Sequence, residues 1–193
     1  TEYYHGQYAP VNELFYITLH AIFGYNPFWF HLACLLVHMS NVVLVYIFIS
    51  RLLVQTKSFE ITSVQRIAFF TALLLAIHPF IVEAVAWVSA SKIILYVLLY
   101  LVALLMYLMY IDTKRFIYYA LSLVFFIISF GAKEQAVVMP FCLVLIVHVL
   151  KRDLKDTQVW LLKLPFFLLT LLFGVITMLS LFSIRCNHAD SSQ

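Results

Sequence analysis

The sequence predicts an all-α, polytopic helical membrane bundle with about six transmembrane helices and a short interfacial helix near its N-terminus. Of the 193 residues, 65% are hydrophobic and only 11% are charged, whereas soluble domains are roughly half apolar and about a quarter charged. Several apolar runs approach or exceed the ~20 residues that a helix needs to cross the hydrocarbon core. This composition excludes a soluble enzyme. The net charge of +3 is also too small and too dispersed for a nucleic-acid surface.

Six apolar segments are expected to cross the membrane. In chain order they are residues 27–50, 67–88, 93–111, 116–130, 136–150 and 164–183. The fourth and fifth are roughly 15 residues long, below the usual length of a spanning helix, so we expect them to extend into their flanks or to tilt toward a broken turn at 131–135. The chain thus divides into an outward segment (1–26), a transmembrane bundle (27–183) and a polar tail (184–193).

The lysines and arginines predict the orientation of the bundle. Nine of the 12 lie in or beside the connections that follow the first, third and fifth crossings, namely Arg51, Lys57, Arg66, Lys114, Arg115, Lys151, Arg152, Lys155 and Lys163. Because basic loops stay in the cytoplasm, this end is expected to be cytoplasmic. The opposite end would face the periplasm or the lumen, in a bacterial inner membrane or an endoplasmic-reticulum membrane.

The second crossing ends, on the outer side, in a segment that contains His78, Pro79 and Glu83. Pro79 removes a backbone donor and crowds the preceding turn, so a freed carbonyl needs another partner. A carboxylate within a membrane span is costly and marks a functional candidate, which makes Glu83 a catalytic or binding group with His78 in support. The alternative is that Glu83 pairs with Lys92 or caps a broken helix.

Polar side chains also form a stripe along the first crossing, where His31, Cys34, His38 and Asn41 follow one another at helical spacing. They either line a polar cavity or hydrogen-bond to neighbouring helices, and we favour the second interpretation for His38 and Asn41, which lie deep. His31 is near the outer boundary and is the better site candidate. A metal site is not expected on this stripe, because no carboxylate or third imidazole has a matching spacing.

Two further outward segments carry candidate residues. The turn at 131–135 contains Lys133, which could attract a phosphate, and Glu134, which is placed at a helix start. The alternative for this turn is a solvated connection with a helix cap. Within 1–26, apolar residues recur at helical spacing after Pro10 and predict a helix lying in the interface, with Asn12 at its start.

The order of these motifs resembles the GT-C glycosyltransferases, in particular the protein O-mannosyltransferases, the transmembrane-and-TPR mannosyltransferases and their bacterial relatives. The resemblance covers about residues 8–150. The matching residues are Tyr8-Ala9-Pro10, Gly24 with Asn26-Pro27, His31 with His38 and Asn41, His78-Pro79 with Glu83-Ala84-Val85, and Lys133-Glu134. The sequence departs from the family pattern at Ala9, where the family has arginine.

The resemblance implies a glycosyltransferase that moves a sugar from a polyprenyl-phosphate donor to a hydroxyl of a protein or glycan on the outer face. It also implies that the main catalytic acid lies upstream of Thr1, with Glu83 and His78 in supporting roles. The expected substrate-binding residues are Tyr8, Asn12, His31, Lys92, Lys133 and Glu134. No cofactor is required by the pattern, although a divalent metal is compatible with the chemistry. The alternatives are a transporter or a non-catalytic membrane assembly subunit.

Overall fold

The described part of the chain folds into helices, as the sequence predicts. The computed structural model describes residues 9–87, 90–150 and 160–190, and these ranges contain no β-strand. The elements in chain order are α1 (Pro10–Phe23), α2 (Pro27–Thr56), α3 (Ile61–Ile77), α4 (Pro79–Ala86), α5 (Ser91–Thr113), α6 (Phe116–Phe130), the 3₁₀-helix η3 (Glu134–Val138), α7 (Met139–Val149) and α9 (Leu164–Asp190). The all-α class is therefore confirmed.

Within the described ranges, two or three spans are long and apolar enough to cross a membrane. Helices α2 and α5 meet this criterion alone, and α3 and α4 meet it together across a bend of 50°. Helix α6 and the segments Gln135–Val149 and Leu164–Ile176 are apolar but shorter. Their crossing of the membrane stays a prediction. Helix α9 continues to Asp190, so the helix includes most of the residues that the sequence analysis assigns to a polar tail.

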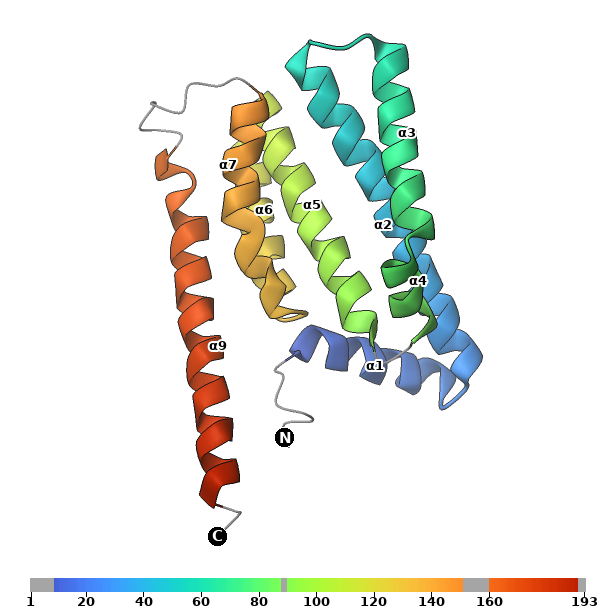
Figure 1. Cartoon of the computed structure of the whole chain (residues 1–193), viewed down its shortest axis with the longest axis vertical. Coiled ribbons are helices and arrows are strands. Elements are labelled where there is room, and N and C mark those ends of the chain that lie inside the picture. Colours follow the sequence, from blue (N-terminus) through green and yellow to red (C-terminus); the bar gives the residue numbers. More distant parts are fainter. Residues whose placement is uncertain (1–8, 88–89, 151–159, 191–193) are drawn as a thin grey trace.

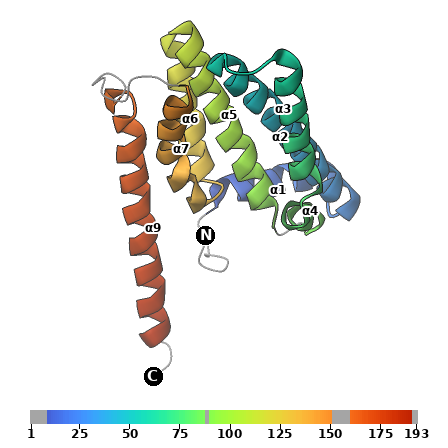
Figure 2. The same cartoon turned by 45° about the horizontal axis from the view of Figure 1, so that its top comes forward.

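Successive long helices run in opposite directions, and α1 lies across one end of them (Figures 1 and 2). The outer end, as we call it from here on, holds α1, α4, the start of α5, and η3 (Figure 1). The opposite end holds the α2–α3 turn, the α5–α6 turn and the start of α9, where the described basic connections lie (Figure 1). The predicted separation of candidate residues from basic connections is thus present. The compartment that each end faces stays a prediction.

Helix α5 is the centre of the bundle because it packs against both α2 and α6. The main core lies between α5, α6, α7 and α9 and is rich in aromatic side chains, including the buried residues Tyr107, Phe126 and Phe166. A second, smaller cluster joins the outer parts of α2, α4 and α5 through Cys34, Ala84 and Ile94. This smaller cluster fixes α4 against the bundle beside the start of α5.

The deep polar residues of α2 form interhelical hydrogen bonds. The side-chain nitrogen Nδ2 of Asn41 donates to the carbonyl oxygen of Ile94 in α5 at 2.9 Å, and His38 donates through Nε2 to the carbonyl oxygen of Ala76 in α3 at 3.3 Å. Both side chains are buried. The interpretation favoured for them, hydrogen bonding between helices, is therefore confirmed.

Candidate functional site

A break in the second apolar segment bends the short helix α4 away from the axis of α3, and α4 runs from this break toward the outer end. His78 has an extended backbone conformation, with ψ 124°, and Pro79 begins α4 directly after it. Because α3 stops at Ile77, its last carbonyls lack intrahelical partners. His38 serves one of them, at Ala76, as described above. The missing N–H of Pro79 affects the carbonyl four residues before it, at Leu75, so the bond from α2 satisfies the neighbouring carbonyl of Ala76 at the end of α3.

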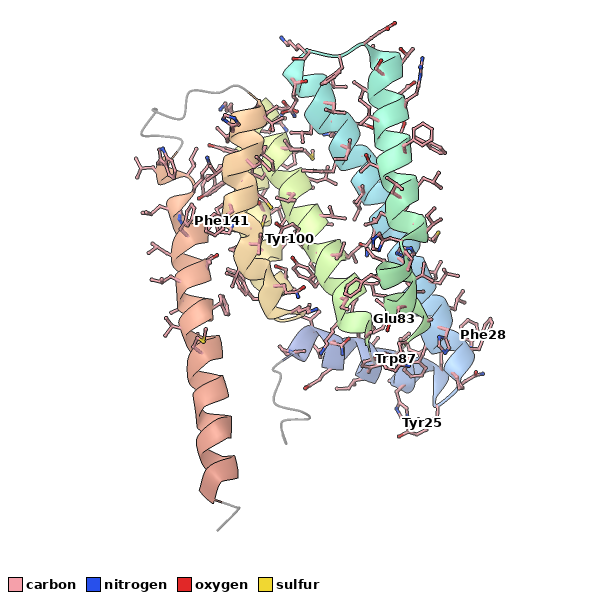
Figure 3. All side chains as sticks on the ribbon, viewed as in Figure 1. Tyr25, Phe28, Glu83, Trp87, Tyr100 and Phe141 are labelled. Atoms are coloured by element: carbon pink, nitrogen blue, oxygen red, sulfur yellow. The ribbon has the colours of Figure 1, made fainter. Side chains whose placement is uncertain are left out.

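Helix α4 is anchored on one side and open on the other. Ala84 is buried against Cys34 and Ile94, whereas Glu83 is exposed on the other side of the helix. Figure 3 shows Glu83 and Trp87 at the end of α4 nearest α1. No described residue forms a hydrogen bond or an ion pair with the Glu83 side chain. The structure thus gives no support to the alternative that Glu83 pairs with Lys92 or caps the broken helix.

The two histidine candidates near the outer end are also exposed. His78 lies at the break between α3 and α4, and His31 lies in the second turn of α2. Neither His78 nor His31 forms a hydrogen bond or an ion pair with a described side chain. Together with Glu83, they are polar groups that remain available to a substrate.

The opposite side of the outer end is tightly connected through α1. The backbone N–H of Val11 donates to the carbonyl oxygen of Gly131 at 3.1 Å, which fixes the start of α1 on the turn after α6. A Cβ atom at Gly131 would lie 3.0 Å from Cγ2 of Val11 and 3.2 Å from the carbonyl oxygen of Ile128. A side chain at this position would be tightly packed, so glycine favours the close approach of α1 to the backbone.

A hydrogen-bonded group of three side chains attaches α1 to the start of α5. The hydroxyl of Ser91 donates to Oδ1 of Asn12 at 2.7 Å and lies 2.6 Å from the hydroxyl of Tyr16. Since Ser91 uses its proton on Asn12, the Tyr16 hydroxyl is the donor to Ser91. Burial raises the pKa of Tyr16 above its ordinary value of 10.0, and the hydrogen bond with Ser91 opposes this shift. Ser91 itself is fully buried.

The two candidate lysines lie on either side of a contact between α5 and η3. The hydroxyl of Tyr96 donates to the carbonyl oxygen of Gln135 at 3.4 Å. Lys92 is one helical turn before Tyr96 on α5 and therefore shares its face. Lys133 precedes Gln135 by two residues, and both lysines are half-buried. The α5–η3 contact thus joins the two segments that carry the candidate lysines Lys92 and Lys133.

The structure describes two of the remaining predicted residues, Tyr8 and Glu134, only in part or not at all. Tyr8 lies outside the described residues. Glu134 begins η3, as expected for a residue at a helix start, but its side chain lies outside the described part. Among the described residues, no group of three histidine, cysteine, aspartate or glutamate side chains is arranged to hold a metal ion.

Sequence reasoning missed three residues that organise this end, namely Ser91, Tyr16 and Tyr96. Ser91 carried a recoverable signal, because a small hydroxyl residue near the start of a long apolar run, here separated from it by one residue, is typical of a helix start. The tyrosines carried none, since tyrosine is common at membrane boundaries without any specific partner.

Fold and site together define a helical membrane protein with polar groups gathered at one end. No family model matches the chain, and no solved structure matches it significantly. Over 104 residues, or 53% of its length, the chain is 34% identical to the protein O-mannosyl-transferase TMTC1 of Homo sapiens and to that of Mus musculus. The match spans 11% of the human protein and 10% of the mouse protein. This similarity supports a mannosyltransferase-like relation.

Proposed function

We propose that the protein acts as a membrane glycosyltransferase, in which this chain forms the part that receives a polyprenyl-phosphate sugar at the outer end. The reaction would transfer the sugar to a hydroxyl of a protein or glycan on the periplasmic or lumenal face. The observation that carries the proposal is the similarity over about half of the chain to proteins named as O-mannosyl-transferases. The gathering of the candidate side chains at the outer end supports it further.

The leaving group of this reaction is a lipid phosphate, whose growing negative charge needs cations. Lys92 and Lys133 would supply them, since their segments meet through Tyr96 and Gln135. The lipid tail would lie along the apolar helices, so its phosphate would be at the membrane boundary, where we expect these lysines to lie. In the reaction, the acceptor oxygen bonds to the anomeric carbon as the carbon–oxygen bond to phosphate breaks, and the acceptor proton passes to a base.

Glu83, His78 and His31 would contact the hydroxyl groups of the substrates. Glu83 has an exposed carboxylate without a partner among the described residues, so it can accept hydrogen bonds from a sugar or an acceptor. His78 lies at the beginning of the same short helix. Asn12 would act differently from our sequence-based expectation, because its side-chain oxygen already accepts from Ser91. Its role in this proposal is to position α1.

The proposal is tested with the full-length protein in lipid nanodiscs, supplied with a radiolabelled polyprenyl-phosphate mannose and with solubilised membrane proteins as acceptors. We expect transfer of label to protein, and a loss of transfer when Lys133 is replaced by alanine. Lys57→Ala is the matched control, because Lys57 lies at the opposite end. Consumption of no polyprenyl-phosphate sugar, combined with solute flux in proteoliposomes, would replace the proposal with a transporter.

A further inference from the structure

The exposed side of α4 combines a carboxylate with two aromatic rings. Successive residues of a helix are separated by 100°, so Phe80 and Glu83 share one side of α4, and Trp87 follows as the C-cap residue of this helix. Phe80 is 62% exposed and Trp87 is 66% exposed. Ala86, which is also exposed on this side, leaves space beside the carboxylate. The backbone N–H of Trp87 donates to the carbonyl oxygen of Glu83 at 2.8 Å, so Trp87 lies one helical turn beyond the carboxylate.

This surface differs from one that only faces lipid. A carboxylate between two rings is costly against hydrocarbon, so the surface must border water or a polar ligand. A pyranose ring has an apolar face of C–H groups that suits an aromatic ring, whose face is electron-rich. Its hydroxyl groups are donors that suit a carboxylate, which only accepts. Both kinds of protein group are present on α4 within one turn.

The charges at the outer end fit a ligand that is neutral at one end and anionic at the other. Glu83 is on α4, whereas Lys92 is on the first turn of α5, and the two helices are joined where Ala84 and Ile94 pack in one cluster. A phosphate would be repelled by Glu83 and attracted by Lys92. A sugar attached to that phosphate can hydrogen-bond to Glu83 without an electrostatic cost.

We propose that Phe80, Glu83 and Trp87 form a subsite for the neutral hexose ring of the substrate, with Trp87 stacking on the ring and Glu83 accepting from its hydroxyl groups. This inference deepens the proposed function and rests on it for the choice of a hexose. Trp87 would thereby determine which sugar is accepted, a role that no comparison with known proteins assigns to it.

The experiment measures sugar binding separately from transfer. The full-length protein in nanodiscs is titrated with methyl α-D-mannopyranoside and followed by saturation-transfer NMR and tryptophan fluorescence. We expect Trp87→Ala and Glu83→Gln each to weaken binding about tenfold, which corresponds to one stacking contact or one charged hydrogen bond. Trp29→Ala is the matched control, because Trp29 is also partly exposed at the outer end but stacks on Phe23 at 4.4 Å.

Each outcome separates the subsite from the proposed function. Binding that Trp87→Ala weakens, with no transfer from any donor, would support the subsite and overturn the glycosyltransferase proposal. Unchanged sugar binding and transfer in Trp87→Ala would overturn the subsite alone. Equal losses of membrane insertion in Trp87→Ala and Trp29→Ala, with sugar affinity unaffected, would also overturn it and would show that Trp87 is only an interfacial anchor. Since Trp87 and Trp29 are both exposed, neither Trp87→Ala nor Trp29→Ala is expected to disturb the core.

Discussion

The outer end contains two regions that differ in how their polar side chains are used. On the side of α1 and η3, the side chains of Asn12, Ser91 and Tyr16 bond to one another and Tyr96 bonds to the η3 backbone. On the exposed side of α4, Glu83 has no partner among the described residues. The first region positions helices, and we call it the connected region. The second is available to a ligand, and we call it the open region. Under the proposed function, this contrast separates candidate residues that would shape the site from those that would contact substrate.

The largest expected effect comes from the open region. If the proposed reaction takes place here, Glu83→Gln should lower the transfer rate about 100-fold, because it removes the charge that would contact the substrate hydroxyl groups. The fold should stay intact, because Glu83 is exposed. The rate of transfer from polyprenyl-phosphate mannose is measured together with the melting temperature. Glu13→Gln, which changes another exposed carboxylate at the outer end, should leave both unchanged. A lower melting temperature in Glu83→Gln would show that Glu83 stabilises the fold, and it would assign Glu83 to the connected region instead.

The next largest effect is expected from a substitution in the connected region, where α1 contacts Gly131. Gly131→Ala places a methyl group 3.0 Å from Val11 and should destabilise the docking of α1 by about 1–3 kcal/mol. Hydrogen exchange of the α1 amides measures this change. Gly174→Ala is the control, because a Cβ atom there meets nothing within 4 Å, and it should stabilise α9 by about 0.5–1 kcal/mol. Equal exchange in the two variants would show that α1 is not held at Gly131.

A smaller effect is expected from loss of the hydrogen bond between His38 and Ala76, which joins α2 to the end of α3. His38→Phe removes the donor to Ala76 and should cost about 1 kcal/mol, because a partly buried carbonyl at the end of α3 loses its partner. Chemical denaturation in detergent measures the free energy of unfolding. Met39→Leu, a change at the neighbouring exposed position, should have no effect. If His38→Phe were equally neutral, the bend between α3 and α4 would not depend on α2.

The smallest effect concerns pH. Because the pKa of Tyr16 is raised above 10.0 by burial, the unfolded chain releases this proton first as the pH increases. The folded state then holds more protons than the unfolded state, so stability should fall above pH 10.0 and remain level below it. Tyr16→Phe should remove its share of this fall, as followed by hydrogen exchange of α1 across that range. An unchanged slope in Tyr16→Phe would contradict the burial of the hydroxyl at Ser91.

Apolar runs and prolines predicted the positions of the helices well. Helix α6 begins and ends at the predicted residues, and the break at Pro79 follows from its missing donor. The predicted end of the first crossing at residue 50 falls short of the end of α2 at Thr56, because helix can continue beyond the apolar run into the polar boundary. Hydropathy marks where a chain enters lipid and does not mark where its helix stops.

The partners of the polar residues were harder to predict. The spacing of His38 and Asn41 placed them on one side of α2, which was enough to favour bonds to neighbouring helices. Nothing local to Asn12 indicated that it would bond to Ser91, 79 residues away. Such a contact depends on how α1 lies across the bundle, and this arrangement is set by packing between helices that are distant in sequence.

The orientation of the bundle is the claim on which the account depends most, and cysteine accessibility measures it directly. Single cysteines replace Glu83, Lys133 or Lys57 in a chain whose native cysteines at 34, 142 and 186 are changed to alanine. In sealed membrane vesicles of known orientation, a membrane-impermeant maleimide should label positions 83 and 133 only from the periplasmic or lumenal side, and position 57 only from the cytoplasmic side. Labelling of positions 83 and 133 from the cytoplasmic side would contradict the account.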